Sequence, residues 1–562
     1  MSKRLAGPGR PGAPRRLGFV VAFLLVCLAA CSRGPEAPGI CELAGPELPV
    51  ADGDSIIEGV IGDASNLISM RAGDSSSHRI SGLIFDGMLT YDKNLSGLEP
   101  RLAERWEVSE GGLQITFYLR KDVRWQDGEP FTARDVEFGF NTITDPNTLT
   151  AYAEDYLQVE KFDVIDDYTF RATYAEPYAP ALATWTNLVV LPRHILEGQN
   201  INEATEFARN PIGLGPYKFE SWETQRQITV HANEGYYRGR PHIERVVTRV
   251  LPDQQTQFLE LKSGGLDSMG LTPLQFTRQT SRPDFTRNIR KYNYLGSGYT
   301  YLGYNLLREP FTDVRVRRAL THAIDKNELV GGVLLGLGKP ASTPYKPGTR
   351  WHNDKIKDLE FDPERAKDLL AQAGWSDTDG DGLLDKGGKP FKFEIITNNG
   401  NEQRAKAATI IQRRFREIGI QAEIRTIEWA AFINEFVDKK NFDAVVLGWS
   451  LDPDPDQYII WHSSKTEPKQ FNFISFSNKK VDELLERGRR TFDPDEREKF
   501  YHEFQEILVE EQPYTFLYYP ESLPAVHCRF LGIEPAPAGI GHNFEDWYVP
   551  TSLQKYAMTA SP

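Results

Sequence analysis

The chain has 562 residues, a formal net charge of −14 and 11% aromatic residues. This length predicts more than one compact unit. A strongly acidic surface repels nucleic acid and anionic lipid headgroups, so the composition argues against a nucleic-acid partner. After the first thirty residues, no stretch is long and apolar enough to cross a membrane.

The first thirty residues have the pattern of a secretory signal peptide. Five basic residues and no acids precede an apolar stretch at 17–30. This stretch is short for a permanent transmembrane helix. The sequence LAAC, ending at Cys31, resembles a bacterial lipobox. This implies cleavage before Cys31 and acylation of its thiol, with an ordinary signal peptide as the alternative. Residues 31–50 would then form a lipid-anchored flexible tether, and cleavage would change the net charge from −14 to −19.

Three cysteines would remain after cleavage. If Cys31 carries lipid, Cys41 and Cys528 are a candidate disulfide pair in an oxidising compartment. Two unrelated thiols are the alternative. We favour the pair because little else in the sequence could hold the N-terminal segment.

The elements that follow the tether mix α and β patterns. Residues 101–108 are expected to form a short helix. Residues 113–125 predict strands, because apolar side chains alternate with polar ones there. Thr132 is expected to cap a helix whose apolar residues recur at helical spacing.

Clear helix starts mark the second half of the chain. Asp325 with Glu328 has the capping-box pattern, and Pro363 and Pro494 each follow an aspartate that predicts an N-cap. Residues 404–419 have one apolar stripe and predict a helix. An alternating strand at 420–427 and a nearly all-apolar strand at 442–449 follow, and the second suits burial on both faces. Helices alternating with buried strands predict an α/β fold.

Familiar catalytic motifs are missing from the sequence. It contains no GxSxG, HExxH, P-loop or CxxC motif, and its ten histidines are scattered. The prediction is therefore that the protein is not an enzyme and needs no cofactor. A secreted hydrolase remains a less favoured alternative.

Several separated segments resemble one protein family. In order, they are similar to signature segments of the solute-binding proteins of peptide ABC importers, the dipeptide and oligopeptide group called family 5. They lie at residues 98–141, 210–219, 232–246, 304–325 and 447–458. The resemblance covers nearly the whole mature chain.

That resemblance implies an α/β fold of the periplasmic binding protein type (type II, cluster C). Two unequal lobes would surround a cleft, and the larger lobe would carry an extra subdomain. The implied division is a signal peptide at 1–30, the tether at 31–50, a larger lobe at 51–79, 202–291 and 511–556, its subdomain at 80–201, and a smaller lobe at 292–510.

The same resemblance suggests where a ligand would bind. In family members that bind peptides, an aspartate of a W-x-x-D segment holds the ligand's α-ammonium, and here that residue is Asp452. It follows a predicted buried strand, at the end where ligands of α/β sheets collect. Trp449 could wall a pocket, Asn305 is another candidate cleft residue, and Arg350 is a candidate partner for the peptide's carboxyl end. Core packing for Trp449 and a strand-end cap for Asn305 are the alternatives.

An acidic loop follows the predicted helix that ends at Gly374. Written as a calcium loop, its ligands would be Asp377, Asp379, Asp381, the Leu383 carbonyl and Asp385. The last position should be a bidentate glutamate and is Gly388. A structural calcium ion and a solvated turn are equally supported by the sequence.

The leading hypothesis is a receptor that captures extended oligopeptides and delivers them to an ABC permease. We expect a monomer at the cell exterior or in the periplasm, anchored to the membrane by lipid. A family 5 receptor for another solute, such as a nickel chelate, an oligosaccharide or an opine, is the main alternative.

Overall fold

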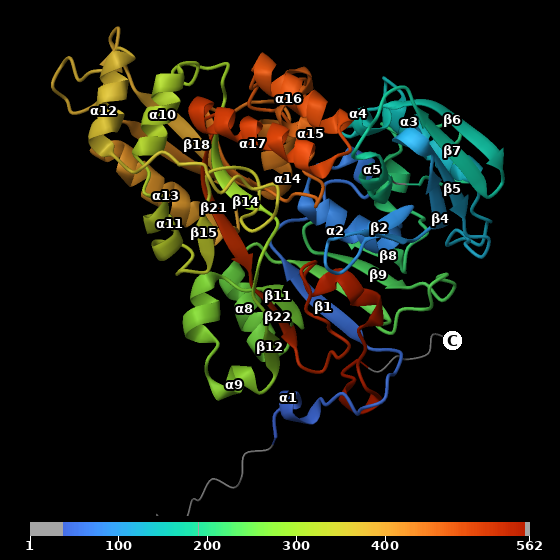
Figure 1. Ribbon diagram of the computed structural model, residues 1–562. Helices are drawn as coiled ribbons and strands as arrows, with labels where there is room; N and C mark the ends of the chain where they lie inside the picture. The colour runs from blue at the N-terminus through green and yellow to red at the C-terminus, as the bar shows by residue number, and fades with distance from the viewer. Residues whose placement is uncertain (1–37, 189, 557–562) are drawn as a thin grey trace, which may run out of the picture.

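The computed structural model describes residues 38–188 and 190–556, which form two lobes (Figure 1). Cys31 and the signal peptide lie outside the described residues. The larger lobe is built on a seven-stranded sheet in which β1 pairs in parallel with β10 and β11. In spatial order its strands are β12 (Ile289–Lys291), β22 (Pro524–His527), β11 (Ser268–Gly270), β1 (Ser55–Val60), β10 (Arg245–Val250), β9 (Gln227–Ala232) and β8 (Tyr217–Glu223).

A second mixed sheet forms the centre of the smaller lobe. Its strands, in spatial order, are β13 (Tyr294–Leu295), β21 (Tyr514–Ser522), β14 (Tyr299–Tyr304), β20 (Ala444–Trp449), β18 (Lys392–Asn398) and β19 (Gln421–Ile427), with β15 (Gly338–Pro340) beside β21. Strand β18 is parallel to both β19 and β20.

Helices cover both faces of the second sheet. One apolar core lies under α10 (Val314–His322), α11 (Lys326–Gly332), α12 (Pro363–Gln372) and α13 (Glu402–Glu417). A second core lies under α15 (Tyr458–Trp461), α16 (Lys479–Arg490) and α17 (Pro494–Glu511). In β20, Val446 belongs to the first core and Val445 to the second. The expectation of a strand buried on both faces is therefore confirmed.

The larger lobe carries an additional four-stranded antiparallel sheet. Its strands are β4 (Ala103–Val108), β5 (Gln114–Leu119), β7 (Thr169–Tyr174) and β6 (Val159–Asp166), and the short strands β2 (Leu89–Tyr91) and β3 (Leu98–Pro100) pair nearby. Around them are α2 (Ser75–Ile84), α3 (Ala133–Thr144), α4 (Ala153–Tyr156), α5 (Ala181–Asn187), α6 (Arg193–Leu196) and α7 (Thr205–Arg209). The residues of this sheet share one continuous core with β1 and β10.

The boundary between the lobes differs from the sequence-based division. Residues from 511 onward were expected in the larger lobe, but β21 lies between β13 and β14 in the smaller-lobe sheet. The chain returns to the larger lobe only between Ser522 and Pro524. Strand partners far apart in the sequence decide this boundary, and the local pattern does not contain them.

Most predicted helix starts are found, and one element is of the wrong type. Thr132 and Asp135 form a capping box at the start of α3, and Asp325 caps α11. Glu328 pairs with arginines of α13 instead of completing a capping box. Residues 101–108 were expected to be a helix, but 103–108 form β4, because pairing with β5 outweighs their local helix preference.

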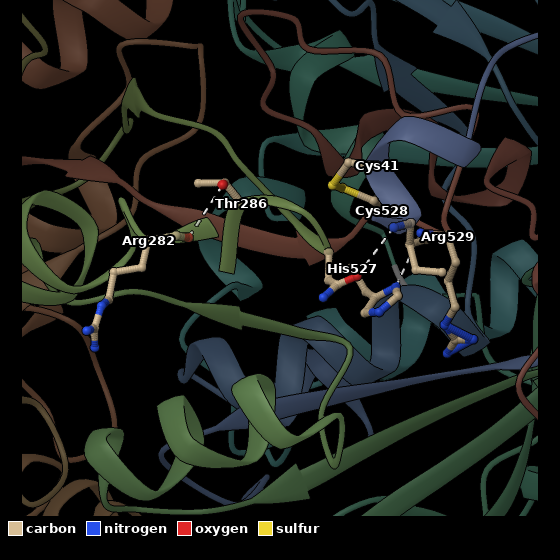
Figure 2. The surroundings of a disulfide bond; sticks show 8 residues. Cys41, Arg282, Thr286, His527, Cys528 and Arg529 are labelled. Carbon is tan, nitrogen blue, oxygen red and sulfur yellow. Dashed lines mark hydrogen bonds between the residues drawn. A yellow bond between two sulfur atoms is a disulfide. The ribbon is translucent and has the colours of Figure 1, made fainter. Parts of the chain in front are cut away.

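The N-terminal segment is attached by a disulfide between Cys41, in α1 (Ile40–Leu43), and Cys528, just after β22 (Figure 2). The two cysteines are 487 positions apart in the sequence. The amide of Cys41 donates to the carbonyl of Arg287 at 2.8 Å, and that of Cys528 to the carbonyl of Asn288 at 2.7 Å. Both cysteines are thus positioned by the segment after α9 (Pro283–Thr286), which completes the larger lobe with α8 (Gln254–Ser263).

Helices long and apolar enough to cross a membrane do not occur among the described residues.

Candidate ligand-binding cleft

A cavity of about 940 Å³ lies between the two lobes. Helices α2 and α5 line it from the larger lobe, and the end of β20 with the loop that follows lines it from the smaller lobe. This volume is at the upper end of the range for small-molecule sites. The cleft could therefore enclose a ligand well above the size of a single amino acid.

Asp452 lies on the cavity wall, three positions beyond the end of β20. The Asn187 side chain, on α5 of the opposite lobe, donates to its Oδ2 at 3.0 Å. The side chain is exposed to the cavity, and the walls of the two lobes partly desolvate it. This desolvation raises the pKa of Asp452, the hydrogen bond from Asn187 opposes the rise, and Asp454 adds to it. No cation pairs with Asp452 among the described residues, so it remains able to accept a cationic ligand group.

Aromatic side chains form an apolar part of the same wall. Trp449, the last residue of β20, packs edge-on against Phe471 with ring centroids 5.3 Å apart. Phe471 packs in the same way against Tyr152 of the larger lobe, again at 5.3 Å. The Trp449 Nε1 donates weakly to the Tyr514 hydroxyl at 3.4 Å. These rings connect the two lobes and offer an apolar surface to a ligand.

The two acids that follow Asp452, Asp454 and Asp456, each pair with a buried arginine. Arg497 donates to both carboxylate oxygens of Asp454, at 2.8 and 2.9 Å. Arg489 donates from Nε to Asp456 at 2.7 Å. Both arginines lie on the helices that cover this face, so these acids fix the loop that carries Asp452.

Two other candidates do not reach the cavity. The Asn305 side chain is buried and donates to the carbonyls of Lys440 and Phe442, so it ties the end of β14 to a neighbouring loop. Arg350 pairs with Asp495 and Glu498 on the surface of α17. The structure therefore corrects their proposed roles in ligand binding.

Three residues that were not expected at the site, Asn187, Arg404 and His78, also lie on the cavity wall. Arg404 lies in the first turn of α13, directly after β18. The rule that ligands collect beyond the carboxyl ends of parallel strands could have indicated Arg404. The other two belong to the larger lobe, and only the closing of the lobes brings them near β20.

The acidic loop lies at the surface, between α12 and the hairpin of β16 (Asp385–Lys386) and β17 (Lys389–Pro390). Carboxylate oxygens of Asp377, Asp379 and Asp381 lie within 4.8 Å of one another. Asp385 does not belong to this group, and its carboxylate accepts hydrogen bonds from the amide and hydroxyl of Thr378. The structure thus removes Asp385 from the expected ligand set. The Leu383 carbonyl stays a predicted ligand.

Two α/β lobes that close over a ligand-sized cavity define a solute-binding protein. The family model described as "Bacterial extracellular solute-binding proteins, family 5 Middle" matches residues 97–470. The chain therefore belongs to this family, and the predicted family and two-lobed fold are both confirmed.

Individual relatives agree over almost the whole chain. The oligopeptide-binding protein AppA of Bacillus subtilis is 32% identical over 541 residues, which covers 94% of this chain and 97% of the relative. The solved structure of that protein in complex with a nonapeptide gives a TM-score of 0.85 at 31% identity, covering 89% of this chain and all of the other. NikZ from Campylobacter jejuni, in complex with Ni(L-His), gives 0.80 at 28% identity, covering 88% and 99%.

Proposed function

We propose that this protein is the solute receptor of an ABC importer and that it captures extended oligopeptides in the cleft between its lobes. The observation that carries the proposal is the large interlobe cavity with Asp452 on its wall, unpaired by any described cation. Similarity to a protein solved with a nonapeptide supports a peptide as the solute.

Asp452 would hold the α-ammonium of the peptide. A charge-assisted hydrogen bond to the carboxylate would be strong once the bound peptide excludes water from it. Every peptide with a free N-terminus has an α-ammonium. The receptor could therefore accept many sequences.

The peptide main chain would pair with the exposed end of β20. Strand β18 pairs with β20 only at Ala444 and Val445, while Leu447, Gly448 and Trp449 line the cavity. The edge of β20 that faces away from β14 thus has no strand partner there, among the described residues. Addition of an extended segment to such an edge gives affinity without side-chain specificity.

The lobes would enclose the peptide and release it by rotating about the two segments that connect them, between Lys291 and Tyr294 and between Ser522 and Pro524. Contacts across the cleft hold the closed form: Asn187 with Asp452, and the Trp429 indole with Asp74 at 3.2 Å. Hinge motion about a few connecting residues is the usual way such lobes open. Delivery to the permease would follow this opening.

One alternative solute has a specific observation in its favour. A structural neighbour at 28% identity was solved with Ni(L-His), so this fold also accommodates metal chelates. An oligosaccharide or an opine as the solute, and a hydrolase as the function, have less support. We propose no catalytic activity. Incubation with pooled peptides would detect hydrolysis directly.

The test of solute identity is native mass spectrometry of protein purified without refolding. The expected result is an added mass that fragments as one peptide or a series of peptides. A nickel-containing adduct, or release of a sugar or opine, would contradict the peptide proposal.

We further propose that Cys31 carries the lipid anchor and that the protein acts as a monomer at the cell exterior or in the periplasm. With Cys41 held by the disulfide, only the residues between the two cysteines would separate lipid from the folded body. At 3.3–3.6 Å per residue, the segment from Cys31 to Cys41 spans at most about 35 Å. This short link would keep the receptor close to its permease. Cys31→Ser should give a soluble protein that still binds ligand, whereas continued membrane attachment would contradict the anchor.

We also propose that the loop of Asp377, Asp379 and Asp381 binds calcium weakly in a structural role. The proximity of the three carboxylates supports this. Backbone amides already satisfy part of their charge, since the Gly380 and Gly382 amides donate to Asp377. The protein would therefore need no calcium to fold.

A further inference from the structure

The wall of the cleft carries an arginine without a carboxylate partner. Arg404 lines the cavity from the first turn of α13, and its Nη1 donates to the Asn398 side chain at 2.8 Å. Among the described residues, no aspartate or glutamate forms an ion pair with Arg404. The side chains of Tyr518 and Tyr301, which are neutral at ordinary pH, also lie near the guanidinium.

This isolation is unusual within the same cavity. Arg101 also lines the wall, but it pairs with Glu545 at 3.1 Å and lies 3.9 Å from Asp86. Burial lowers the pKa of Arg404, yet an arginine stays protonated at neutral pH. A desolvated cation without a counter-ion costs free energy, and an anionic ligand group would remove that cost.

The backbone beside Arg404 leaves room for its guanidinium. Gly448, in β20, lies next to it: a Cβ added at Gly448 would be 3.0 Å from Arg404 Nη2 and 2.8 Å from the Tyr299 carbonyl oxygen. Any larger residue would push the guanidinium away from the end of β20. Asp452 follows on the same wall, four positions after Gly448.

We propose that Arg404 is the subsite for a carboxylate of the bound ligand. This rests on the proposed peptide-receptor function and makes it more specific. Asp452 and Arg404 both lie on the cavity wall without an ion-pair partner among the described residues, so a ligand with an ammonium and a carboxylate complements both. The carboxylate comes from the C-terminus of a short peptide or from an acidic side chain of a longer one. The guanidinium keeps donors beyond the bond to Asn398 with which to hold it.

The experiment titrates two pairs of peptides into the wild type and Arg404→Gln. The first pair is one short peptide as the free acid and as the C-terminal amide. The second is a longer peptide with glutamate or glutamine at one position, scanned along its length. We expect the wild type to prefer the carboxylate member of one pair by at least about thirtyfold, as for a buried charge pair that loses one partner. Arg404→Gln should abolish this preference, and the pair that responds identifies the source of the carboxylate.

Two controls separate this subsite from the ammonium site and from a structural role. Acetylation of the peptide N-terminus should weaken binding to Arg404→Gln as much as to the wild type, because that change acts at Asp452. Arg404→Lys keeps the charge without the planar fork and should retain part of the preference. Equal binding of both members of both pairs by the wild type would overturn the subsite while leaving peptide binding intact.

The melting temperature of the ligand-free protein tests the role of Arg404 without any peptide. If Arg404 is an unpaired cation, Arg404→Met should leave the melting temperature of the ligand-free protein unchanged or higher. A clear decrease would mean that the guanidinium supports the fold, and it would overturn the proposal. Failure of the wild type to bind any peptide would instead count against the proposed function.

Discussion

Arg489 of the smaller lobe bonds to Asp155 of the larger lobe, with 2.7 Å between Nη2 and Oδ1. The same guanidinium is bonded to Asp456 of its own lobe. Burial raises the pKa of Asp155 to about 7, although Arg489 acts in the opposite direction. Arg489 lies in α16 and Asp155 in α4. The two lobes are thus joined by a buried ion pair that forms only where they meet.

Replacing this arginine should open the protein. Arg489→Leu leaves Asp155 and Asp456 buried without their cation, and breaking such a pair costs about 3–5 kcal/mol. Peptide affinity should fall, and small-angle scattering should give a larger radius of gyration for the variant. The control is Arg490→Leu: its pair with Glu176 also crosses the lobes, but both side chains are more than half exposed, so little should change. Unaltered affinity in Arg489→Leu would show that other contacts hold the lobes closed.

Asp452→Asn tests recognition of the ligand's α-ammonium. The change keeps the shape and removes the charge, which should cost about 2–5 kcal/mol of binding free energy, or roughly thirtyfold to several-thousand-fold in affinity. N-acetylated peptide should bind the wild type poorly and lose little more in the variant, because both changes remove one interaction. Isothermal titration of both peptides against both proteins measures the coupling. Equal binding of free and acetylated peptide by the wild type would reject this role.

Peptide affinity should also depend on pH in a direction set by Asp452. Its pKa is raised by burial, so protonation in the free protein begins at a higher pH than for an ordinary aspartate. Only the carboxylate attracts the ammonium, so affinity should fall as the pH is lowered through that pKa, and Asp452→Asn should not show the fall. Asp438 also lines the cavity, and burial raises its pKa to about 6. Asp438→Asn is therefore the control, and it should keep the dependence on pH.

Calcium should stabilise the acidic loop at millimolar concentration, the range of extracellular sites with incomplete ligation. The melting temperature should rise with calcium in the wild type but not in Asp379→Ala with Asp381→Ala. Asp385→Asn is the matched control: it disturbs the bonds to Thr378 and should leave the calcium shift in place. A shift that persists in the double variant would assign the effect to another site.

Removing the disulfide should destabilise the larger lobe. A double variant, Cys41→Ser with Cys528→Ser, avoids a free thiol and should lower the free energy of unfolding by about 2–4 kcal/mol, the usual range for a native disulfide. Denaturant titration measures this change, and proteolysis near residue 44 should become faster as α1 detaches. Reducing agent should reproduce the loss in the wild type and have no effect on the variant. Equal stability of oxidised and reduced wild type would contradict the prediction.

The sequence by itself determined the family, most of the elements and the position of Asp452. Helix caps such as Asp362, strand alternation in β5 and the apolar run of β20 are encoded by neighbouring residues, so contiguous patterns reveal them. Residues 103–108 show the limit of this reasoning, because a partner strand outweighed their local preference.

Only the tertiary structure decided the composition of the cleft. Asp155 and Arg489 are 334 positions apart and Asn187 and Asp452 are 265 apart, and no local pattern encodes such contacts. The same holds for β21, whose partners place it in the smaller lobe. The missing ion pair of Arg404 is also a tertiary property, because it depends on every group that the fold brings near the guanidinium. Burial of this unpaired cation then favours binding of an anion.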